Sequence, residues 1–508
     1  VVNAAGTAGN RILPLLPNLS NHSYNRPFGH AWLAMSELDL CFLTATELAG
    51  RIATKNVSAR EVMTAHLEQI EHVNPKVNAI VTLVAEQAMA AAGKADEAIA
   101  RDESVGPLHG IPVAHKDLIP TRGIRTTLGS RVFADQIPDH DGLIVERLRD
   151  AGALTIGKTN TPEFGAGSQT FNEVFGATRN PYDLTKTCGG SSGGAAVAVA
   201  TGMTPIADGT DFGGSLRNPA GFCNVVGLRP SAGRVPVWPT PAPEFRLDVQ
   251  GPIARTVEDI ALMLSVIAGP DARSPIALPE PGLSFRQSLI RDFSGTRIAW
   301  SRSLGGLPVD GRVTAVVEPN RAIFETLGCQ VDDAEPVLSD ADEIFRVWRA
   351  WYYEFAFGKL LDSHRAVLKD TVVWNIEEGR RLNAQQLDRT TVAWAKLTQR
   401  VEEFFETFAF LVLPVSQVPP FDINTPYVTE INGEVLQTYL DWMRSCYFIS
   451  VTGLPAIAVP CGFTNTGLPV GIQIVGRPED DFGLLQLAYA FEQVTGVGQH
   501  RPAIAGAG

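Results

Sequence analysis

The sequence predicts an α/β protein built on a large, mixed and mostly parallel β-sheet that is covered by helices on both faces. Short, buried-looking strands such as "HGIPVAHKD" at 109–117 alternate along the chain with helical segments, and Gly-rich loops join them. Such alternation is typical of sheets with helices on both faces. With 508 residues, 45% of them apolar, the chain is long enough to bury a sizeable core.

The chain divides into regions of different composition. Residues 1–34 show no clear periodicity, and we expect them to be an N-terminal arm, a processed leader or a cloning remnant. We expect residues 35–508 to form a single domain. Within it, residues 270–440 form a variable region of Pro-rich loops and long helices, with dense aromatics at 345–357.

The first elements of the domain are helices with recognisable ends. Two capping boxes, Thr44 with Glu47 and Ser58 with Glu61, predict helix starts. Pro75 predicts the end of the second helix.

The later elements alternate between strand and helix. The segment 145–160, "VERLRDAGALTIGKTN", reads as a helix, a Gly stop and a strand. A small apolar helix at 191–202 precedes a strand at 204–214, "TPIADGTDFGG". Two strands, "GLPAIAVPCGF" and "GLPVGIQIVGR", and a helix from about 482 close the domain.

Composition excludes several classes of function. The net charge is −13 without a basic block, which excludes the usual footprint of a nucleic-acid binder. The six cysteines include no C-x-x-C pair, so we expect reduced, mostly buried thiols and a cytoplasmic protein. No His cluster predicts a metal or cofactor, and no apolar run is long enough for a membrane helix. A homo-oligomer is compatible with this composition.

Two Gly-rich loops, 189–194 and 208–220, could bind negative charge. Glycine lets backbone N–H groups approach a ligand, and successive N–H groups at a turn form a concavity for an anion. An acyl-transfer enzyme needs such a concavity for its oxyanion. Ser191, in a G-x-S-x-G pattern, and Ser215, after two glycines, are the candidate nucleophiles.

A serine nucleophile needs a base, and the sequence contains two kinds of candidate. Only His364 and His500 follow Ser191 in the chain, one in a helical aromatic region and one in the tail. Lys116 ends a buried-looking strand, where burial favours the neutral amine. We expect His115 to point to the opposite face and to pack there.

Taken in order, these motifs resemble those of the amidase signature family. The resemblance runs from about Leu43 to Gln493. The matching segments are "GIPVAHKD", "GKTNTPEF", "GGSSGG", "DGTDFGGSLRNPA", "GLRPSAGRV", "GPIARTVEDIA", "LVLP" and "GLPAIAVPCGF…GLPVGIQIVGR". Several long motifs in the family's order are a strong signal, whereas a lone G-x-S-x-G pattern is weak.

The resemblance implies the amidase-signature fold and a Ser-cisSer-Lys triad. Ser215 would be the nucleophile and Lys116 the terminal base and acid. Ser191 would bridge them, following a cis peptide bond after Gly190. The implied oxyanion hole consists of the backbone N–H groups of Phe212, Gly213, Gly214 and Ser215. Asp211 and Arg217 match the family's structural ion pair, and Ser192 would add a supporting hydrogen bond.

The resemblance also implies an activity. We expect a serine hydrolase that cleaves amide C–N bonds through an acyl-enzyme, without metal or cofactor. Apolar or aryl amides are the expected small-molecule substrates, together with esters and carbamates, including urethanes. The alternative is the amidotransferase subunit of a tRNA-dependent transamidation complex, with protein partners and glutamine as ammonia donor. The aromatics at 345–357 are expected to serve as helix core, with some of them in the pocket.

Overall fold

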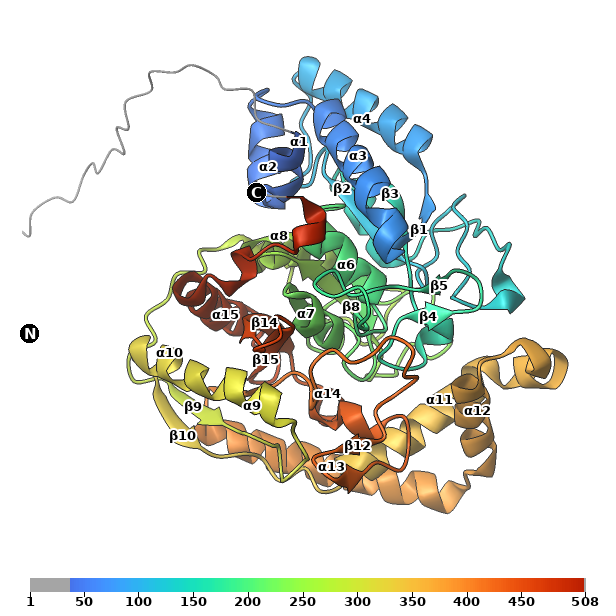
Figure 1. Ribbon diagram of the computed structural model, residues 1–508, viewed down its shortest axis with the longest axis vertical. Helices are drawn as coiled ribbons and strands as arrows, with labels where there is room; N and C mark the ends of the chain where they lie inside the picture. Colours follow the sequence, from blue (N-terminus) through green and yellow to red (C-terminus); the bar gives the residue numbers. More distant parts are fainter. Residues whose placement is uncertain (1–36, 507–508) are drawn as a thin grey trace, which may run out of the picture. The chain divides into compact units, whose positions relative to one another are not determined.

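An eleven-stranded sheet forms the centre of the computed structural model, which describes residues 37–506 (Figure 1). The strand order is β1-β3-β2-β6-β8-β7-β14-β15-β11-β9-β10. The expected N-terminal arm, leader or remnant at residues 1–34 lies outside the described residues. The strands are β1 (Ile80–Leu83), β2 (Pro112–Lys116), β3 (Leu154–Thr159), β6 (Ile206–Asp211), β7 (Val226–Arg229), β8 (Val249–Ala254), β9 (Arg297–Trp300), β10 (Gln330–Asp333), β11 (Phe410–Pro414), β14 (Ala456–Phe463) and β15 (Pro469–Gly476).

The sheet is mixed, as predicted, but six of its ten neighbouring strand pairs are antiparallel, so the expected parallel majority is not found. Antiparallel pairing takes up its centre, from β6 to β11, and also joins β1 to β3. Parallel pairing is confined to the flanks, in β3-β2-β6 and β11-β9-β10. The centre is antiparallel partly because β14 and β15 follow each other through a short connection, which only antiparallel neighbours allow. Two small hairpins, β4 (Phe171–Asn172) with β5 (Gly176–Ala177) and β12 (Glu430–Ile431) with β13 (Glu434–Val435), lie outside the sheet.

Helices cover both faces of the sheet, which confirms the predicted layering. Successive strand residues point to opposite faces; in β2, Val113 joins one hydrophobic cluster and Ala114 another. The first cluster includes α2 (Ala45–Ala53), α5 (Leu143–Asp150), α8 (Val257–Ile267) and α15 (Asp481–Thr495). The second includes α3 (Ala59–Val77), α4 (Ala85–Ala100), α6 (Gly193–Ala200) and α7 (Arg217–Cys223).

The predicted helix starts are confirmed, and one predicted end is wrong. Thr44 and Ser58 both form complete capping boxes, at the starts of α2 and α3. Pro75 lies inside α3, which continues to Val77. A proline in the last turn removes a single intrahelical hydrogen bond, so it need not end the helix.

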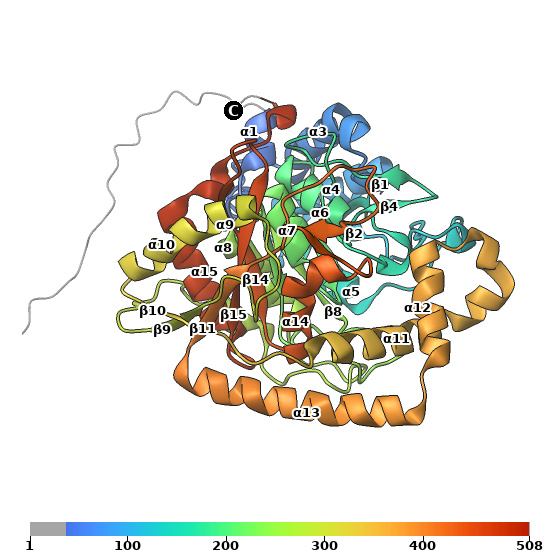
Figure 2. The ribbon, with the colours of Figure 1, turned by 60° about the horizontal axis from the view of Figure 1, so that its bottom comes forward.

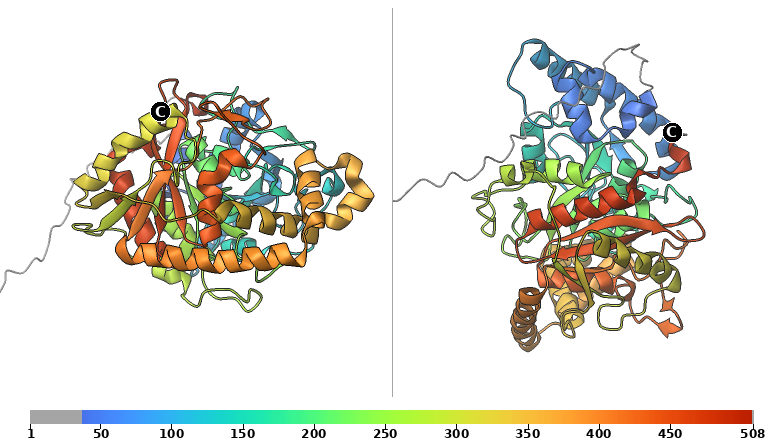
Figure 3. Two further views of the ribbon diagram at one scale, coloured as in Figure 1. Left: turned by 90° about the horizontal axis from the view of Figure 1, so that it is seen from below. Right: turned by 90° about the vertical axis from the view of Figure 1, so that its left-hand side faces the viewer.

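The variable region contributes to the sheet as well as to the helical layer. Strands β9, β10 and β11 come from it and complete one flank. One of its two longest helices, α13, is labelled across the lower part of Figure 2 and is seen again from below in the left view of Figure 3. The remaining helices are α1 (Glu37–Phe42), α9 (Gly311–Val317), α10 (Arg321–Thr326), α11 (Ala341–His364), α12 (Asp370–Arg381), α13 (Ala384–Thr407) and α14 (Arg444–Thr452).

Two further sequence expectations concern the chain as a whole. All six cysteines are buried, as predicted. Within residues 37–506, every helix is too short or too polar to serve as a membrane span.

Candidate active site

Lys116 lies at the centre of a cluster of hydroxyl groups. It is the last residue of β2, and its side chain is fully buried. Its Nζ donates hydrogen bonds to Ser191 Oγ at 2.7 Å, Ser192 Oγ at 2.9 Å and Thr210 Oγ1 at 2.9 Å. The structure therefore brings together three of the predicted residues: Lys116 from β2, and Ser191 and Ser192 from the first Gly-rich loop. Thr210, in β6, joins them.

The backbone around Lys116 is fixed by a buried carboxylate. The Lys116 N–H donates to Asp208 Oδ1 at 2.7 Å, and His115 Nδ1 donates to Asp208 Oδ2 at 2.5 Å. The other ring nitrogen of His115 lies 3.0 Å from Thr155 Oγ1. His115 is buried and has both nitrogens occupied, so it supports the end of β2, in agreement with its expected packing role.

Burial makes Lys116 a base near neutral pH. Removal from water lowers the pKa of Lys116 to about 7, although the charges of Asp248, Asp211 and Asp208 act to raise it. All three hydrogen-bond partners of its Nζ are hydroxyls, and none is a carboxylate. A lysine in these surroundings can hold a proton or release it to a neighbouring hydroxyl at physiological pH.

The loop that carries Ser191 has the predicted backbone. The peptide bond between Gly190 and Ser191 is cis, as expected from the resemblance. A Cβ atom at Gly190 would lie 3.0 Å from the backbone nitrogen of Gln169, which is tighter than most real contacts. A Cβ at Gly165 would approach Ser191 Oγ to 3.4 Å. The segment 163–170 therefore packs directly on Ser191 and on the glycine before it.

Ser215 faces the same cavity as Ser191. It lies in the turn between β6 and α7, and its carbonyl oxygen accepts a hydrogen bond from the Ser192 N–H at 3.2 Å. Its hydroxyl has no hydrogen-bond partner among residues 37–506. The cavity measures about 200 Å³. It is lined by Leu118, Pro120, Leu128, Phe164, Gly165, Ser191, Thr210, Phe212, Ser215, Val237, Trp238, Pro239, Thr240, Pro241, Asp248, Gln250, Arg349, Tyr352, Tyr353 and Phe357.

Three of the four predicted oxyanion donors are available. The N–H groups of Phe212, Gly213 and Ser215 have no acceptor in the described part of the chain. The N–H of Gly214 instead donates to Asp211 Oδ1 at 2.8 Å. Gly214 therefore contributes to the shape of the turn, and its N–H is not free to bind an oxyanion in this structure.

Asp211 anchors the turn that carries Ser215. Its carboxylate forms the predicted ion pair with Arg217, with two contacts of 3.1 Å, and a second pair with Arg229 at 3.1 Å. Burial alone would raise the pKa of Asp211, but the charges of the two arginines hold it well below its usual value. The carboxylate also accepts the Leu216 N–H at 3.2 Å. An ionised, multiply bonded carboxylate therefore fixes the backbone of the turn that carries Ser215.

Helix α11 closes the cavity with aromatic side chains. Tyr352, Tyr353 and Phe357 line it together with Arg349, at the spacing of one helix face. Phe345, from the same helix, is buried and stacks on Tyr447, with ring centroids 4.1 Å apart. The aromatic segment therefore supplies both core and pocket, as expected.

Sequence reasoning missed several residues of this site. Arg229 lies within a recognised motif, but the sequence did not indicate that it pairs with Asp211. Thr210 and Gln250 are neighbours in the β6–β8 pairing, and Asp248 immediately precedes β8. For Asp248 and Gln250, a sequence signal exists in the polar residues at every second position near the start of β8.

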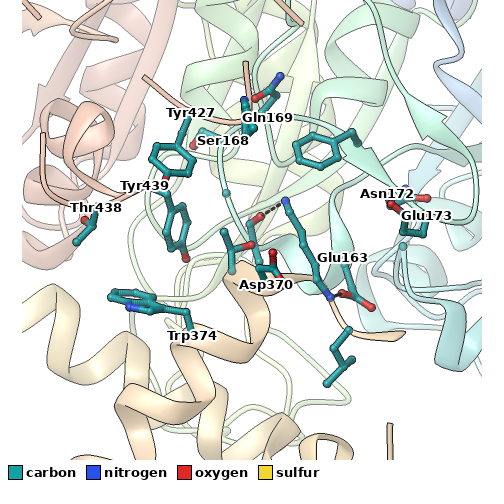
Figure 4. A pocket seen from close by; sticks show the side chains of 18 of the residues that line it. Glu163, Ser168, Gln169, Asn172, Glu173, Asp370, Trp374, Tyr427, Thr438 and Tyr439 are labelled. Atoms are coloured by element: carbon teal, nitrogen blue, oxygen red, sulfur yellow. Dashed lines mark hydrogen bonds between the residues drawn. The ribbon is translucent and has the colours of Figure 1, made fainter. Parts of the chain in front are cut away.

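A second, larger cavity lies on the other side of the segment 163–169. It measures about 700 Å³, and Figure 4 shows Tyr427, Tyr439 and Trp374 along one part of its wall. Lys369 Nζ donates to the Ala166 carbonyl at 3.1 Å within it. None of the predicted catalytic residues lines this cavity.

Comparison with known proteins places this site in a family. The family model described as Amidase matches residues 61–485. The acylamidase of Rhodococcus erythropolis is 37% identical, over 92% of this chain and 99% of that protein. One chain of the glutamyl-tRNA(Gln) amidotransferase of Moorella thermoacetica is 36% identical, over 92% and 99%.

Solved structures agree with the sequence comparison. A bacterial aryl acylamidase of the amidase signature family superimposes with a TM-score of 0.83 at 30% identity, covering 91% of this chain and 99% of that chain. A 6-aminohexanoate cyclic dimer hydrolase, solved with its substrate, gives 0.84 at 26% identity, covering 92% and 100%. The chain therefore belongs to the amidase family and is an amide-hydrolysing enzyme.

Proposed function

We propose that this enzyme is a serine hydrolase that cleaves amide C–N bonds through Ser215, Ser191 and Lys116. The observation that carries the proposal is the buried Lys116, whose Nζ meets only hydroxyl groups and lies 2.7 Å from Ser191 Oγ. A neutral lysine beside a bridging hydroxyl, with a second serine on the same cavity, is the arrangement that a proton relay requires.

The first half of the reaction forms an acyl-enzyme. Lys116 accepts the proton of Ser191 while Ser191 accepts the proton of Ser215, and Ser215 Oγ attacks the substrate carbonyl carbon. The negative charge that develops on the carbonyl oxygen is stabilised by the free N–H groups at Phe212, Gly213 and Ser215. Lys116 holds the extra proton as an ammonium that three hydroxyls solvate.

The relay then runs in reverse to release the amine. Lys116 returns its proton through Ser191 to the leaving nitrogen as the C–N bond breaks, because an amide anion is a poor leaving group. Water then enters, gives a proton to the same relay and hydrolyses the ester bond between the acyl group and Ser215. Esters need less proton donation and are cleaved by the same steps.

The cavity favours apolar or aryl amides. Phe164, Phe212, Trp238, Tyr352 and Phe357 line it, so a planar or apolar group is buried against aromatic faces there. The acylamidase and aryl acylamidase relatives support this preference. Carbamates, including urethanes, present a similar carbonyl, and their cleavage would release an amine, an alcohol and carbon dioxide.

A second candidate function rests on the amidotransferase relatives. These match the chain at 33–36% identity over nearly their full length, close to the 37% of the acylamidase. In this alternative the same triad would release ammonia from glutamine and would work with partner proteins. Glutaminase activity of the isolated chain, or stable association with such partners, would favour it.

A substrate panel decides between the two functions. The purified chain is assayed with p-nitroanilides, primary amides, esters, aryl carbamates and glutamine, and the substrates are ranked by kcat/KM. We expect anilides and aryl esters to rank first and glutamine last, with all activity absent in Ser215→Ala. Glutamine ranked first would establish the alternative, and unchanged activity in Ser215→Ala would overturn the proposed nucleophile.

A further inference from the structure

Two polar side chains at the start of β8, Asp248 just before the strand and Gln250 within it, reach the catalytic cavity without a protein partner. Asp248 and Gln250 both line the cavity that holds Ser191 and Ser215. They are two positions apart, and residues at this spacing on a strand point to the same side. Val249, between them, is buried in the opposite direction. The triad therefore has two unassigned polar neighbours on one wall.

Gln250 is a buried amide that the protein leaves unsatisfied. Its side chain is 8% exposed, and its Oε1 atom is buried without a hydrogen-bond partner. Its Nε2 also has no acceptor among the described residues. Buried polar groups are nearly always hydrogen-bonded, and an unpaired one costs about 1–3 kcal/mol. A group that enters the cavity can satisfy this amide.

Asp248 is a carboxylate without an ion-pair or hydrogen-bond partner within residues 37–506. Among the described residues, Arg349 is the only cation that lines the cavity, and it is engaged with the hydroxyls of Tyr353 and Tyr439 at 3.1–3.3 Å. Burial raises the pKa of Asp248 to about 6, against the opposing charges of Lys116 and Arg229. At neutral pH the carboxylate is therefore ionised and can accept a hydrogen bond.

We propose that Asp248 and Gln250 form a subsite for a second amide group of the substrate, next to the scissile amide. An amide offers one donor and one acceptor: its N–H donates to the Asp248 carboxylate, and its carbonyl oxygen accepts from the Gln250 NH₂ group. The rest of the wall is largely apolar, so no other side chain of this strand competes for the group. This inference rests on the proposed function and narrows its substrates to diamides and peptide-like amides.

The direct test compares two substrates that share one scissile bond and one leaving group. N-Acetylglycine 4-nitroanilide carries a second amide, whereas pentanoic acid 4-nitroanilide has the same chain length without it. We expect wild-type kcat/KM to favour the first by about tenfold or more, the scale expected when a site's polar groups are left unpaired. Asp248→Asn and Gln250→Leu should each bring the ratio close to one.

A second pair places the extra amide on the amine side. Benzoyl glycinamide carries it, and benzoyl isobutylamine is the matched amide without it. Ratios near one for both pairs in the wild type, or ratios that the two substitutions leave unchanged, would overturn the subsite. Failure of the wild type to cleave any of the four substrates would instead count against the proposed hydrolase function.

The ratio removes the effect of Asp248 on the relay. Asp248 also influences the charge of Lys116, so Asp248→Asn alters the chemistry common to both substrates, but that change cancels in the comparison. Gln330→Leu, on the exposed edge strand β10, is a matched control for Gln250→Leu. It should leave the ratios unchanged.

Thermal unfolding separates a substrate-binding role of Gln250 from a structural one. Replacing an unsatisfied buried amide by an apolar side chain of similar size should be neutral or stabilising. We therefore expect Gln250→Leu to keep or raise the unfolding midpoint while it loses substrate discrimination. A midpoint lowered by several degrees would show that the amide serves the fold and would contradict the subsite.

Discussion

Lys116 in β2 and Lys158 in β3 are both fully buried on adjacent strands, yet their surroundings differ. Lys158 pairs in register with His115, so the two lysines point to opposite faces of the sheet. Lys158 Nζ donates to the Ile119 carbonyl at 2.5 Å and to Thr121 Oγ1 at 2.7 Å, in the electrostatic field of Asp117. Burial lowers its pKa only to about 8.

The two buried lysines differ in their partners, and the proposed function gives them different roles for that reason. Lys158 bonds a backbone carbonyl that cannot accept or pass on a proton, and it ties a loop to the sheet. Lys116 bonds three hydroxyls, one of which, Ser191, lies on the catalytic cavity. Burial alone therefore does not distinguish the two lysines, and the proposal that Lys116 is the base rests on its position beside Ser191 and the cavity that Ser215 also lines.

Removing the amine of Lys116 should have the largest effect on activity. We expect Lys116→Met to lower kcat/KM for anilides by about 10³-fold, within the usual range for a general base. Activated esters should lose less, because their leaving group needs little protonation. The losses are measured side by side on a p-nitroanilide and the matching p-nitrophenyl ester. Equal losses would contradict proton donation to the leaving group.

The pH profile should report Lys116 and not Lys158. The base must be deprotonated, so kcat/KM should rise about tenfold per pH unit below the Lys116 pKa of about 7 and level off above it. Lys158→Met should leave this rising acid limb of the pH profile unchanged. A flat profile between pH 5.5 and 8, or a limb lost in Lys158→Met, would reverse the assignment of the two lysines.

Thr210→Val should have a smaller effect. It removes one of the three hydroxyls that solvate the Lys116 ammonium and keeps the shape of the side chain. Loss of an acceptor disfavours the charged form, so the acid limb should move to lower pH and kcat for anilides should fall about three- to tenfold. A shift of the limb to higher pH would contradict the proposed solvation of the ammonium.

Lys158→Met should change activity least and stability most. It leaves the Ile119 carbonyl and the Thr121 hydroxyl without their donor and removes the positive charge that acts on the buried Asp117. Buried polar groups that lose their partner are destabilising. We expect the unfolding midpoint to fall by about 5 °C, with kcat/KM per folded molecule within about twofold of wild type. A loss of activity as large as that of Lys116→Met would contradict the different roles proposed for Lys116 and Lys158.

Part of this site could be predicted because it lies in contiguous motifs. Lys116, Ser191 and Ser215 each belong to a short Gly-containing segment, and the cis bond before Ser191 was expected from the same motif. The order of helices and strands was also readable, because burial in this fold follows local periodicity. The hydrogen bond from the Gly214 N–H to Asp211 could not be predicted, because only the structure shows that the Asp211 carboxylate reaches it.

The remaining residues depend on long-range pairing that no local pattern encodes. Asp248 and Gln250 reach the cavity because β8 pairs antiparallel with β6, which places Gln250 opposite Thr210. Tyr352 and Phe357 come from a helix far along the chain that crosses the cavity. Antiparallel pairing at the centre of the sheet could not be predicted from strand–helix alternation, which favours parallel neighbours.

The most direct measurement locates the acyl group on the enzyme. The wild type is incubated with a slowly deacylating p-nitrophenyl carbamate, digested and analysed by tandem mass spectrometry. No Lys or Arg lies between Ser191 and Ser215, so one tryptic peptide carries both serines and fragment ions must assign the adduct. We predict the adduct on Ser215 and its absence in Ser215→Ala. An adduct on Ser191, or one that persists in Ser215→Ala, would contradict the proposed relay.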